Sequence, residues 1–365
     1  MNPKVLLIIH RLTYGGAGKV MAFLANKLSV EGFDVYLLTY EGGELMQFLA
    51  ASVHRVQFRY PPPPIPVLKR VLQIVQLKGM ITRIKPDLAI SFLPYPNMIS
   101  IAACKAAGVP IIIAERGDPS AHRSWFTAIR DIFYNFADGC VFQTCGAQKY
   151  YPRNIQAKGV IIPNPVDADK IPVPWSGERD DTIVNVGRFD LEDKRQDLLI
   201  KAFARVADRF PDIKLILIGD GKDQKVIEHV IAECHLKERV ILPGATMNVY
   251  AMIRKAKVFV LSSDHEGYPN ALIEAMSVGL PCISTNCPSG APAEIIQHME
   301  NGMLIEPGSI DELADAMAFL LENPETAAAM GTNARQIIPK LDGNTIIEQW
   351  KSYITKFMGE TYSSR

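Results

Sequence analysis

Short apolar runs of strand-forming residues alternate with longer helix-forming stretches along the whole chain of 365 residues. The runs are rich in β-branched and aromatic residues, which is typical of buried strands. Regular alternation of strand and helix predicts parallel sheets with helices on both faces. We therefore expect an α/β fold with two doubly wound, Rossmann-like domains. The predicted strands are Lys4–Ile9, Asp34–Thr39, Asp87–Phe92, Val109–Ala114, Gly139–Phe142, Thr182–Val186, Lys214–Ile218, Arg239–Pro243, Lys257–Leu261 and Pro281–Ser284.

A change in composition near the middle of the chain predicts a domain boundary. The segment Lys170–Asp181 is rich in proline, glycine and charge, as linkers between domains often are. We expect an N-terminal domain over residues 1–168 and a C-terminal domain over residues 169–344. A chain of this length can bury a core in each domain.

The formal net charge is zero, from 39 basic and 39 acidic residues, but the charges are unevenly distributed. Residues 1–165 hold 18 Lys and Arg against 9 Asp and Glu, and the remainder holds 21 against 30. A basic half can face anions such as a membrane surface or a phosphorylated acceptor. Ordinary variation in surface charge explains the same numbers, so both interpretations stay open.

The six cysteines include no CxxC pair, and several lie in or near apolar strands. This pattern predicts buried free thiols in a reducing compartment. No apolar run approaches the roughly 20 residues of a membrane-spanning helix, and Val5–Ile9 is too short for a signal peptide. We expect a cytoplasmic protein, with peripheral contact to the cytoplasmic membrane face left open, and no nucleic-acid partner.

The turn after the first strand, Thr13–Gly18, is rich in glycine and precedes a predicted helix at Lys19–Val30. It departs from the dinucleotide-binding fingerprint because Met21 stands where the third glycine belongs. It departs from the P-loop because Val20 stands where Ser or Thr is required. A simple tight turn and a backbone that approaches a substrate are equally open for this segment.

The stretch Ser262–Gly279 carries the most specific functional pattern. It follows a predicted strand, and Pro269 suits the first turn of a helix. Backbone N–H groups at a helix N-terminus bind phosphate oxygens well. Glu266 lies in the loop before the helix, and Glu274 lies inside it. The alternative is a solvated surface helix with two ordinary acids, but Gly267 and Pro269 predict a tight backbone beside Glu266.

Two cations follow the predicted strand Thr182–Val186. Arg188 and Lys194 lie in a polar loop before the predicted helix Gln196–Phe210. A guanidinium and an ammonium group at a strand end can neutralise a diphosphate leaving group. Taken alone, these residues are equally explained by a solvated charged loop.

Together these segments resemble one enzyme family. Glu266-Gly-Tyr-Pro-Asn270 with Glu274-Ala275, the Gly-Arg-x(5)-Lys pattern ending at Lys194, and Val160–Asp167 are similar to the signature of family 4 glycosyltransferases. These are retaining, nucleotide-sugar-dependent enzymes of the GT-B fold, and the chain resembles members that build bacterial lipid-linked oligosaccharides and polysaccharides. The resemblance implies two Rossmann-like domains facing a cleft, with a C-terminal helix, residues 345–358, returning to the first domain.

The resemblance also implies roles for individual residues. The catalytic residues would be Glu266, which contacts the donor sugar, and Arg188 with Lys194, which hold the diphosphate. Glu274 would bind the ribose hydroxyls of the donor. The other residues implied in donor binding are Gly16, Gly219, Ala245, Met247, Gly267, Tyr268, Pro269 and Asn270.

On the acceptor side the resemblance implies Glu115 and Arg116, although many members have histidine where this chain has Arg116. Asp167 and Asp169 form a D-x-D, a pattern that elsewhere marks a metal site for a nucleotide sugar. Here the pair stands at the linker, and enzymes of the GT-B fold hold the diphosphate without metal. We therefore expect no metal and no resident cofactor, with a nucleotide sugar as co-substrate.

The expected reaction is transfer of a hexose or N-acetylhexosamine from a UDP-sugar to a hydroxyl of a glycan, carried by a lipid in cell-surface polysaccharide or glycan biosynthesis. Transfer from GDP-mannose is the alternative within the class. A UDP-sugar 2-epimerase of the same fold is a second possible enzyme class. Such an enzyme would transfer protons with carboxylates and a histidine, and His265 beside Glu266 is the candidate pair. A nucleotide-sugar-binding protein without catalysis is the third possibility.

Tyr60–Pro66 predicts a stiff polyproline spacer, and a basic amphipathic helix follows it at Val67–Lys85. Such a helix can lie on an anionic membrane, or it can pack on a sheet with its cations solvated. The cations of this helix are Lys69, Arg70, Lys78, Arg83 and Lys85.

Overall fold

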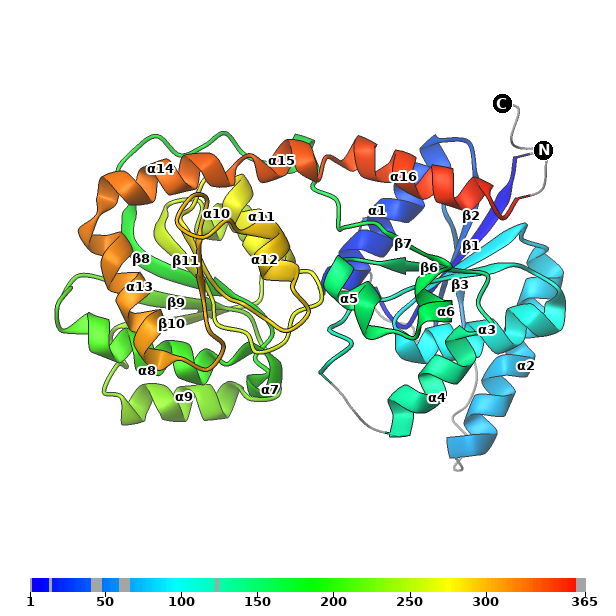
Figure 1. Ribbon diagram of the computed structural model, residues 1–365, viewed down its shortest axis with the longest axis horizontal. Helices are drawn as coiled ribbons and strands as arrows, with labels where there is room; N and C mark the ends of the chain where they lie inside the picture. Colours follow the sequence, from blue (N-terminus) through cyan, green and yellow to red (C-terminus); the bar gives the residue numbers. More distant parts are fainter. Residues whose placement is uncertain (1, 13–14, 41–47, 59–65, 122–124, 359–365) are drawn as a thin grey trace. The chain divides into compact units, whose positions relative to one another are not determined.

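The computed structural model describes residues 2–12, 15–40, 48–58, 66–121 and 125–358, with the side chains of 66 and 67 left aside. The chain divides into two compact units (Figure 1). Unit 1 comprises Met1–Pro165 and Asn344–Arg365, and unit 2 comprises Val166–Gly343. From the sequence, we predicted that the N-terminal domain ends at residue 168 and the C-terminal domain at residue 344. The predicted polyproline stretch, apart from Pro66, lies outside the described residues.

Unit 1 is built on a parallel sheet of seven strands in the order β3-β2-β1-β4-β5-β6-β7. The strands are β1 (Lys4–Ile9), β2 (Asp34–Thr39), β3 (His54–Gln57), β4 (Leu88–Phe92), β5 (Ile111–Ala114), β6 (Gly139–Phe142) and β7 (Gly159–Ile161). The helices are α1 (Gly16–Val30), α2 (Pro66–Ile84), α3 (Pro94–Ala107), α4 (Trp125–Tyr134), α5 (Cys145–Tyr150), α6 (Arg153–Gln156) and the C-terminal α16 (Gly343–Thr355).

The two faces of this sheet are covered by different helices. Side chains of a strand alternate between faces, and β1 shows the consequence. Val5, Leu7 and Ile9 pack in a core shared with α1 and α16. Leu6 and Ile8 pack in a second core shared with α2, α3 and α4. Both faces are therefore buried, as expected for a doubly wound parallel sheet.

The C-terminal helix α16 is fixed to unit 1 by large buried side chains. Trp350 is only 1% exposed and stacks on Phe92 with ring centroids 6.0 Å apart. The Tyr353 hydroxyl accepts a hydrogen bond from the Cys140 N–H at 3.0 Å and donates to the Lys158 carbonyl. A side chain at Gly139 would come within 2.6 Å of the Tyr353 hydroxyl, so glycine allows this close approach.

Unit 2 holds a parallel sheet of six strands in the order β10-β9-β8-β11-β12-β13. The strands are β8 (Asp180–Val186), β9 (Lys214–Ile218), β10 (Val240–Gly244), β11 (Ala256–Leu261), β12 (Cys282–Thr285) and β13 (Met303–Ile305). The helical elements are η1 (Ala168–Lys170), α7 (Leu191–Lys194), α8 (Gln196–Ala207), α9 (Gln224–Glu233), α10 (Val249–Ile253), α11 (Asn270–Ser277), α12 (Ala291–Ile295), α13 (Ile310–Glu322), α14 (Pro324–Ala334) and α15 (Ile337–Lys340). One face packs with α8, α9 and α13, and the other packs with α10 and α11.

Several predicted elements differ from the structure at their ends. Helix α1 begins at Gly16 rather than Lys19, so Gly16 and Gly18 lie in its first turn and not in a turn before it. The polar loop before α8 contains the helical turn α7. The predicted helix Gln196–Phe210 corresponds to α8, which ends at Ala207.

The cysteine prediction is partly wrong. Cys104, Cys140, Cys282 and Cys287 are buried free thiols, but Cys145 is exposed and Cys234 is half-buried. Burial raises the pKa of the Cys104 thiol to about 12, which makes it an unreactive core residue.

Candidate active site

The strand order of unit 2 reverses between β8 and β11. Strands β9 and β10 follow on one side of this point, and β12 and β13 follow on the other. Ligands of open parallel sheets bind beyond the carboxyl ends of the strands at such a reversal. The segments that leave β8 and β11 here are 187–195 and 262–269, which contain the predicted Arg188, Lys194 and Glu266.

Lys194 and Glu266 meet at this point. The Lys194 Nζ lies 2.7 Å from Glu266 Oε1, and the side chains are 19% and 10% exposed. The ammonium group also lies 3.5 Å from the His265 carbonyl oxygen. An ammonium group has three N–H donors, so Lys194 can bind Glu266 and still donate to a phosphate oxygen.

The Glu266 carboxylate is held through one of its two oxygens, Oε1. Ser263, which is fully buried, donates a hydrogen bond from its hydroxyl to the same Oε1 at 2.7 Å. No described residue bonds to Oε2 of Glu266, which leaves that oxygen for a ligand hydroxyl. The Thr285 hydroxyl and the Cys287 thiol both donate hydrogen bonds to the Ser263 carbonyl. These bonds hold Ser263 in the position from which it binds Glu266.

Arg188 is presented to solvent. Its side chain is 63% exposed, with Nη2 3.3 Å from Asp193 Oδ2 and 3.4 Å from Asp190 Oδ2. The Asp193 carbonyl accepts the N–H groups of Asp264 and His265, which ties the loop after β8 to the loop after β11. Arg188 therefore stands on the same connected pair of loops as Lys194 and Glu266, with donors left for an anion.

A second ion pair between these loops was missed by the sequence analysis. Arg195 adopts a left-handed backbone conformation, with φ of 47°, and its Nη1 lies 2.6 Å from Asp264 Oδ2. It also binds Asp197 at 3.1 Å. The available signal was local: Arg195 directly follows Lys194, and Asp264 shortly precedes Glu266. A second pair parallel to Lys194–Glu266 could have been predicted from that arrangement.

The loop before α11 has a confined backbone. Pro269 precedes the first helical residue, Asn270, and is buried. Tyr268 packs on the core, and burial, with a contribution from Glu294, raises the pKa of its phenol. Glu274 is half-buried on α11 beside α10. Burial raises the pKa of Tyr250 to about 12, and the nearby Glu274 carboxylate adds to the shift. The segment 267–270 thus leads into a helix N-terminus at the strand reversal.

Two glycines are required where β8 and β9 end. A Cβ at Gly219 would overlap the Gly187 carbonyl oxygen, and one at Gly221 would overlap the Phe189 carbonyl oxygen. Phe189 donates its N–H to the Asp220 carbonyl at 2.7 Å, so the two loops are bonded together. Gly219 thereby supports the segment that carries Arg188.

The remaining predicted donor residues are more scattered. Ala245 and Met247 are exposed and follow β10, the edge strand, two strands from β8. Gly16 lies in the first turn of α1 in unit 1. Among the described residues, no hydrogen bond or ion pair joins Ala245 or Met247 to the Lys194–Glu266 pair.

The predicted acceptor residue Glu115 is buried in a hydrogen-bond network. Its Oε1 accepts from the Tyr134 hydroxyl at 2.5 Å, and its Oε2 accepts from the Tyr151 hydroxyl at 2.6 Å. Asn97 donates to Oε1 at 3.3 Å. Burial and the Glu115 carboxylate raise the pKa of both phenols, which keeps them protonated as donors. An acceptor could reach Glu115 only if these tyrosines moved.

The other predicted acceptor residue, Arg116, is also buried. Its guanidinium lies 4.3 Å from the centre of the Phe92 ring and 5.6 Å from that of Trp350. Its Nη1 donates to Asn164 Oδ1 at 3.0 Å. Burial lowers its pKa to about 9. Arg116 therefore joins the end of β5 to α16 and to the last residues of unit 1.

The D-x-D at the boundary of the units is engaged with the chain itself. Asp167 Oδ2 lies 2.7 Å from Lys170 Nζ, and Asp169 lies in the turn η1. Among the residues that the structure describes, no group of three His, Cys, Asp or Glu side chains is arranged to hold a metal ion.

Two family models match the chain in succession. One, described as Glycosyltransferase Family 4, matches residues 14–170, and the other, described as Glycosyl transferases group 1, matches residues 168–337. Together with two parallel sheets in separate units, these matches define a glycosyltransferase of the GT-B fold. The chain belongs to the family 4 glycosyltransferases, which confirms the predicted family and fold class.

Relatives span the full length of the chain. One from Campylobacter jejuni is named GalNAc-alpha-(1->4)-GalNAc-alpha-(1->3)-diNAcBac-PP-undecaprenol alpha-1,4-N-acetyl-D-galactosaminyltransferase, and it is 28% identical over 97% of this chain and 98% of its own length. A second, an N-acetylgalactosamine-N,N'-diacetylbacillosaminyl-diphospho-undecaprenol 4-alpha-N-acetylgalactosaminyltransferase of the same organism, is 26% identical over 91% of this chain and 94% of its own. HepE of Anabaena, solved with UDP and glucose, shares the fold, with a TM-score of 0.84, 18% identity and coverage of 97% of this chain and 100% of its own.

Proposed function

We propose that this glycosyltransferase moves a hexose or N-acetylhexosamine from a UDP-sugar to a hydroxyl of a lipid-linked glycan, with retention of configuration at the anomeric carbon. The observation that carries the proposal is the Lys194–Glu266 pair at the strand reversal of unit 2. A cation and a carboxylate at one point suit a ligand with a negative diphosphate and a neutral, hydroxyl-rich sugar.

The donor diphosphate would be held by cations and amides. Lys194 and the exposed Arg188 supply charge, and the backbone N–H groups of 267–270 supply donors at the start of α11. As the bond between the anomeric carbon and the phosphate oxygen breaks, negative charge grows on the diphosphate. Preorganised donors stabilise this charge most in the transition state.

The sugar would bind to Glu266 through its hydroxyl groups. Lys194 and Ser263 hold Oε1, so Oε2 accepts a hydrogen bond from a sugar hydroxyl at a fixed position. Glu274, further along the helix, would accept hydrogen bonds from the ribose of the nucleotide. The acceptor hydroxyl attacks the same face that the diphosphate leaves, and the departing phosphate oxygen takes its proton. No second base is required for this step.

The choice of UDP and of a lipid-linked acceptor rests on the relatives. Two of them are named as N-acetylgalactosaminyltransferases of undecaprenol-linked substrates, and the fold neighbour HepE was solved with UDP. We place the reaction at the cytoplasmic face of a membrane and expect neither a metal nor a resident cofactor. GDP-mannose is the alternative donor.

A donor screen tests the proposal. Purified protein is incubated with UDP-hexoses, UDP-N-acetylhexosamines and GDP-mannose, and released nucleotide diphosphate is measured with and without a lipid-linked glycan extract. Release of UDP from one UDP-sugar, increased by the extract, supports the proposal. Release of GDP alone would favour the mannosyltransferase. An epimerised UDP-sugar without acceptor would favour the epimerase, and donor binding without release would leave a binding protein.

A further inference from the structure

Helix α4 turns a row of large apolar side chains toward solvent. Trp125, Ile129, Ile132 and Phe136, with Phe136 just beyond the helix end, are 69%, 37%, 59% and 61% exposed. Their spacing places them on one side of the helix, opposite the buried Tyr134. A contiguous exposed row of this size marks an interaction surface rather than scattered surface residues. We refer to these four residues as the α4 row.

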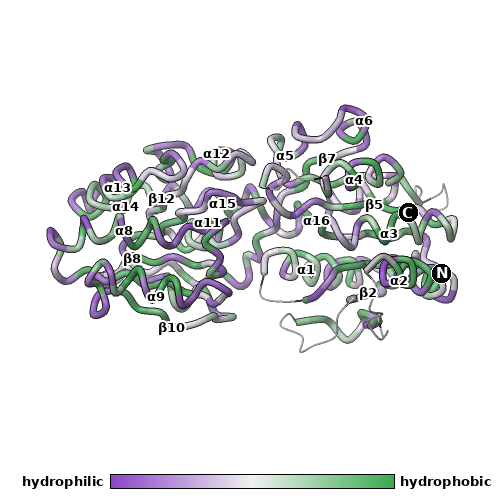
Figure 2. Tube along the Cα trace, turned by 90° about the horizontal axis from the view of Figure 1, so that it is seen from below, coloured by the Kyte–Doolittle hydropathy of each residue, from purple (hydrophilic) through white to green (hydrophobic). Residues whose placement is uncertain are grey.

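Helix α2 carries a second such row. Leu68, Val71, Leu72 and Val75 are 45%, 50%, 37% and 60% exposed, and they lie opposite the buried Leu77 and Ile81. We refer to these four as the α2 row. Helix α3 packs between α2 and α4 on the same face of the unit 1 sheet (Figure 1). Both rows therefore point away from that sheet, and hydrophobic residues alternate with hydrophilic ones along these helices (Figure 2).

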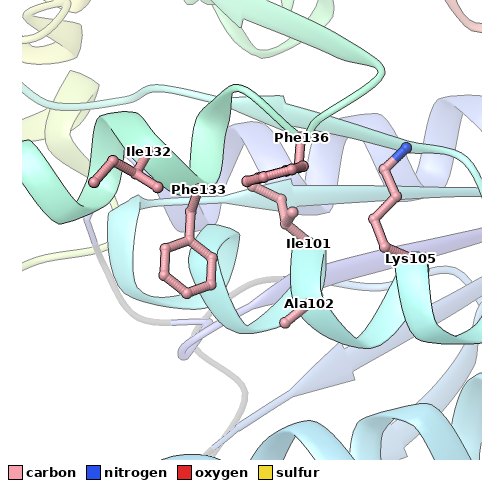
Figure 3. A pocket seen from close by; sticks show the side chains of 6 residues that line it. All are labelled: Ile101, Ala102, Lys105, Ile132, Phe133 and Phe136. Atoms are coloured by element: carbon pink, nitrogen blue, oxygen red, sulfur yellow. The ribbon is translucent and has the colours of Figure 1, made fainter.

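A pocket of about 200 Å³ opens between α3 and α4. Figure 3 shows Ile101, Ala102 and the Lys105 stem from α3 beside Ile132, Phe133 and Phe136. Apart from the Lys105 ammonium, which binds Asp138 at 2.6 Å, the lining is hydrocarbon. A cavity of about 150 Å³ accepts benzene, so this pocket has room for a short piece of hydrocarbon chain.

The charges on α2, α3 and α4 indicate which kind of partner covers their outer surface. The residue ranges of α2, α3 and α4 contain one carboxylate, Asp131, and it pairs with Arg130 at 2.9 Å. The cations on the same helices, apart from Arg130, are Lys69, Arg70, Lys78, Arg83 and Lys105. Apolar rows flanked by cations, with almost no acidic residue, match the interface of an anionic bilayer. A symmetric contact with a second copy would place this positive surface against itself.

We propose that the outer surface of α2, α3 and α4 docks on an anionic lipid bilayer, with the α4 row inserted among the acyl chains and the α2 cations at the headgroups. This inference rests on the proposed function in one respect: the bilayer would supply the lipid-linked acceptor of the proposed reaction. In the part of the chain that the structure describes, no helix is long and apolar enough to cross a membrane, so the contact would be peripheral.

Flotation with vesicles tests the docking without donor or acceptor. Wild-type protein is mixed with phosphatidylcholine vesicles with and without phosphatidylglycerol, at low and high salt. We expect binding to the anionic vesicles, lowered about tenfold or more in the variant Trp125→Ser/Ile132→Ser/Phe136→Ser. The matched control, Val173→Ser/Val226→Ser, removes exposed apolar side chains from unit 2 and should bind like wild type.

A second measurement does not depend on that variant folding. Trp125 is 69% exposed and Trp350 is 1% exposed, so Trp175→Phe leaves Trp125 as the tryptophan that can report on the lipid. We expect its emission to shift to the blue and to be quenched by brominated lipid. Absence of both changes, or vesicle binding equal in the α4-row variant and the control, would overturn the inference. A dimer that the α4-row variant dissociates, without vesicle binding, would also overturn it. Donor hydrolysis is measured separately, so failure here leaves the proposed function standing.

Discussion

The Lys194 Nζ lies 2.7 Å from Glu266 Oε1 although the two residues are 72 positions apart in the chain. The pair forms because β8 and β11 are neighbours in the sheet, so the loops that leave them start side by side. Ser263 adds a second hydrogen bond to the same oxygen. This pairing occupies Glu266 Oε1 and leaves the other N–H groups of the Lys194 ammonium able to donate to a ligand.

Replacing either cation of the donor site should lower turnover strongly. In the proposed mechanism, Lys194→Ala and Arg188→Ala each remove one group that stabilises charge on the leaving diphosphate. Loss of one such group costs on the order of 3 kcal/mol, or about a hundredfold in kcat. Single-turnover rates with the donor identified in the screen measure the effect.

The control for this pair is Lys201→Ala, which removes an exposed cation from α8 in the same unit. It should leave turnover unchanged. Thermal unfolding of all three variants separates a catalytic effect from a folding effect, because Lys194 also pairs with a carboxylate that is only 10% exposed. A near-wild-type rate in either Lys194→Ala or Arg188→Ala would refute the diphosphate assignment.

Glu115→Ala should destabilise unit 1 rather than only weaken acceptor binding. The substitution leaves the Tyr134 and Tyr151 hydroxyls without their acceptor and removes one of the two carboxylates near the buried Arg130. A loss of about 3 kcal/mol in the free energy of unfolding is expected. Denaturant titration measures it.

Two further variants sharpen this test. Glu115→Gln keeps an oxygen acceptor and should lose less stability than Glu115→Ala. Glu348→Ala breaks an exposed ion pair with Lys351 and should cost no more than about 1 kcal/mol. A large rise in acceptor KM with unchanged stability in Glu115→Ala would instead assign Glu115 to the acceptor site.

The sequence was sufficient for the fold class, and its short motifs brought Lys194 and Glu266 forward as candidates for the site. Strand and helix alternation predicted the central strands of both sheets, because a buried parallel strand has a distinctive composition. The short strands β3, β7 and β13 were not predicted. Strand ends and turn residues placed Lys194 and Glu266 in loops at the sheet edge, and the family resemblance supplied their expected roles. Their side chains do meet in the structure.

Contacts that depend on tertiary packing could not be predicted from the sequence. The hydrogen bond from Ser263 to Glu266 depends on how the loop after β11 folds back, and no local pattern specifies it. The left-handed backbone at Arg195 is likewise not specified by the sequence, although the neighbouring Lys194 and Glu266 offered a signal for the Arg195–Asp264 pair. Glu115 has the same appearance in sequence whether it faces a ligand or two tyrosines. The start of α1 at Gly16 was missed because glycine is a poor helix former, and the fold overrides that preference here.

His10 should make the protein more sensitive to mild acid. It follows β1 and lies among the rings of Tyr40 and Tyr95, and burial, then Arg11 and Lys69, lower its pKa from 6.5. The unfolded chain therefore binds a proton more readily than the folded chain below pH 6.5. Stability from neutral His10 is present above pH 6.5 and is lost as the pH falls through the lowered value.

The measurement is the thermal midpoint at pH 7 and at pH 5. His10→Asn should lose less stability between these values than wild type. His229→Asn, an exposed histidine on α9 in unit 2, serves as the control and should behave like wild type. An equal loss in wild type and His10→Asn would remove His10 as the source of acid sensitivity.

Turnover should survive chelation of divalent metals. In the proposed mechanism, Arg188, Lys194 and the N-terminus of α11 offset the charge of the leaving diphosphate, and a cation from solution is then not required. Asp167, the first residue of the D-x-D, already pairs with Lys170 at 2.7 Å. We expect the rate of nucleotide diphosphate release to be the same in excess EDTA and in magnesium, and Asp167→Asn to keep it. Complete loss in EDTA, restored by manganese or magnesium and weakened in Asp167→Asn, would make Asp167 a metal ligand.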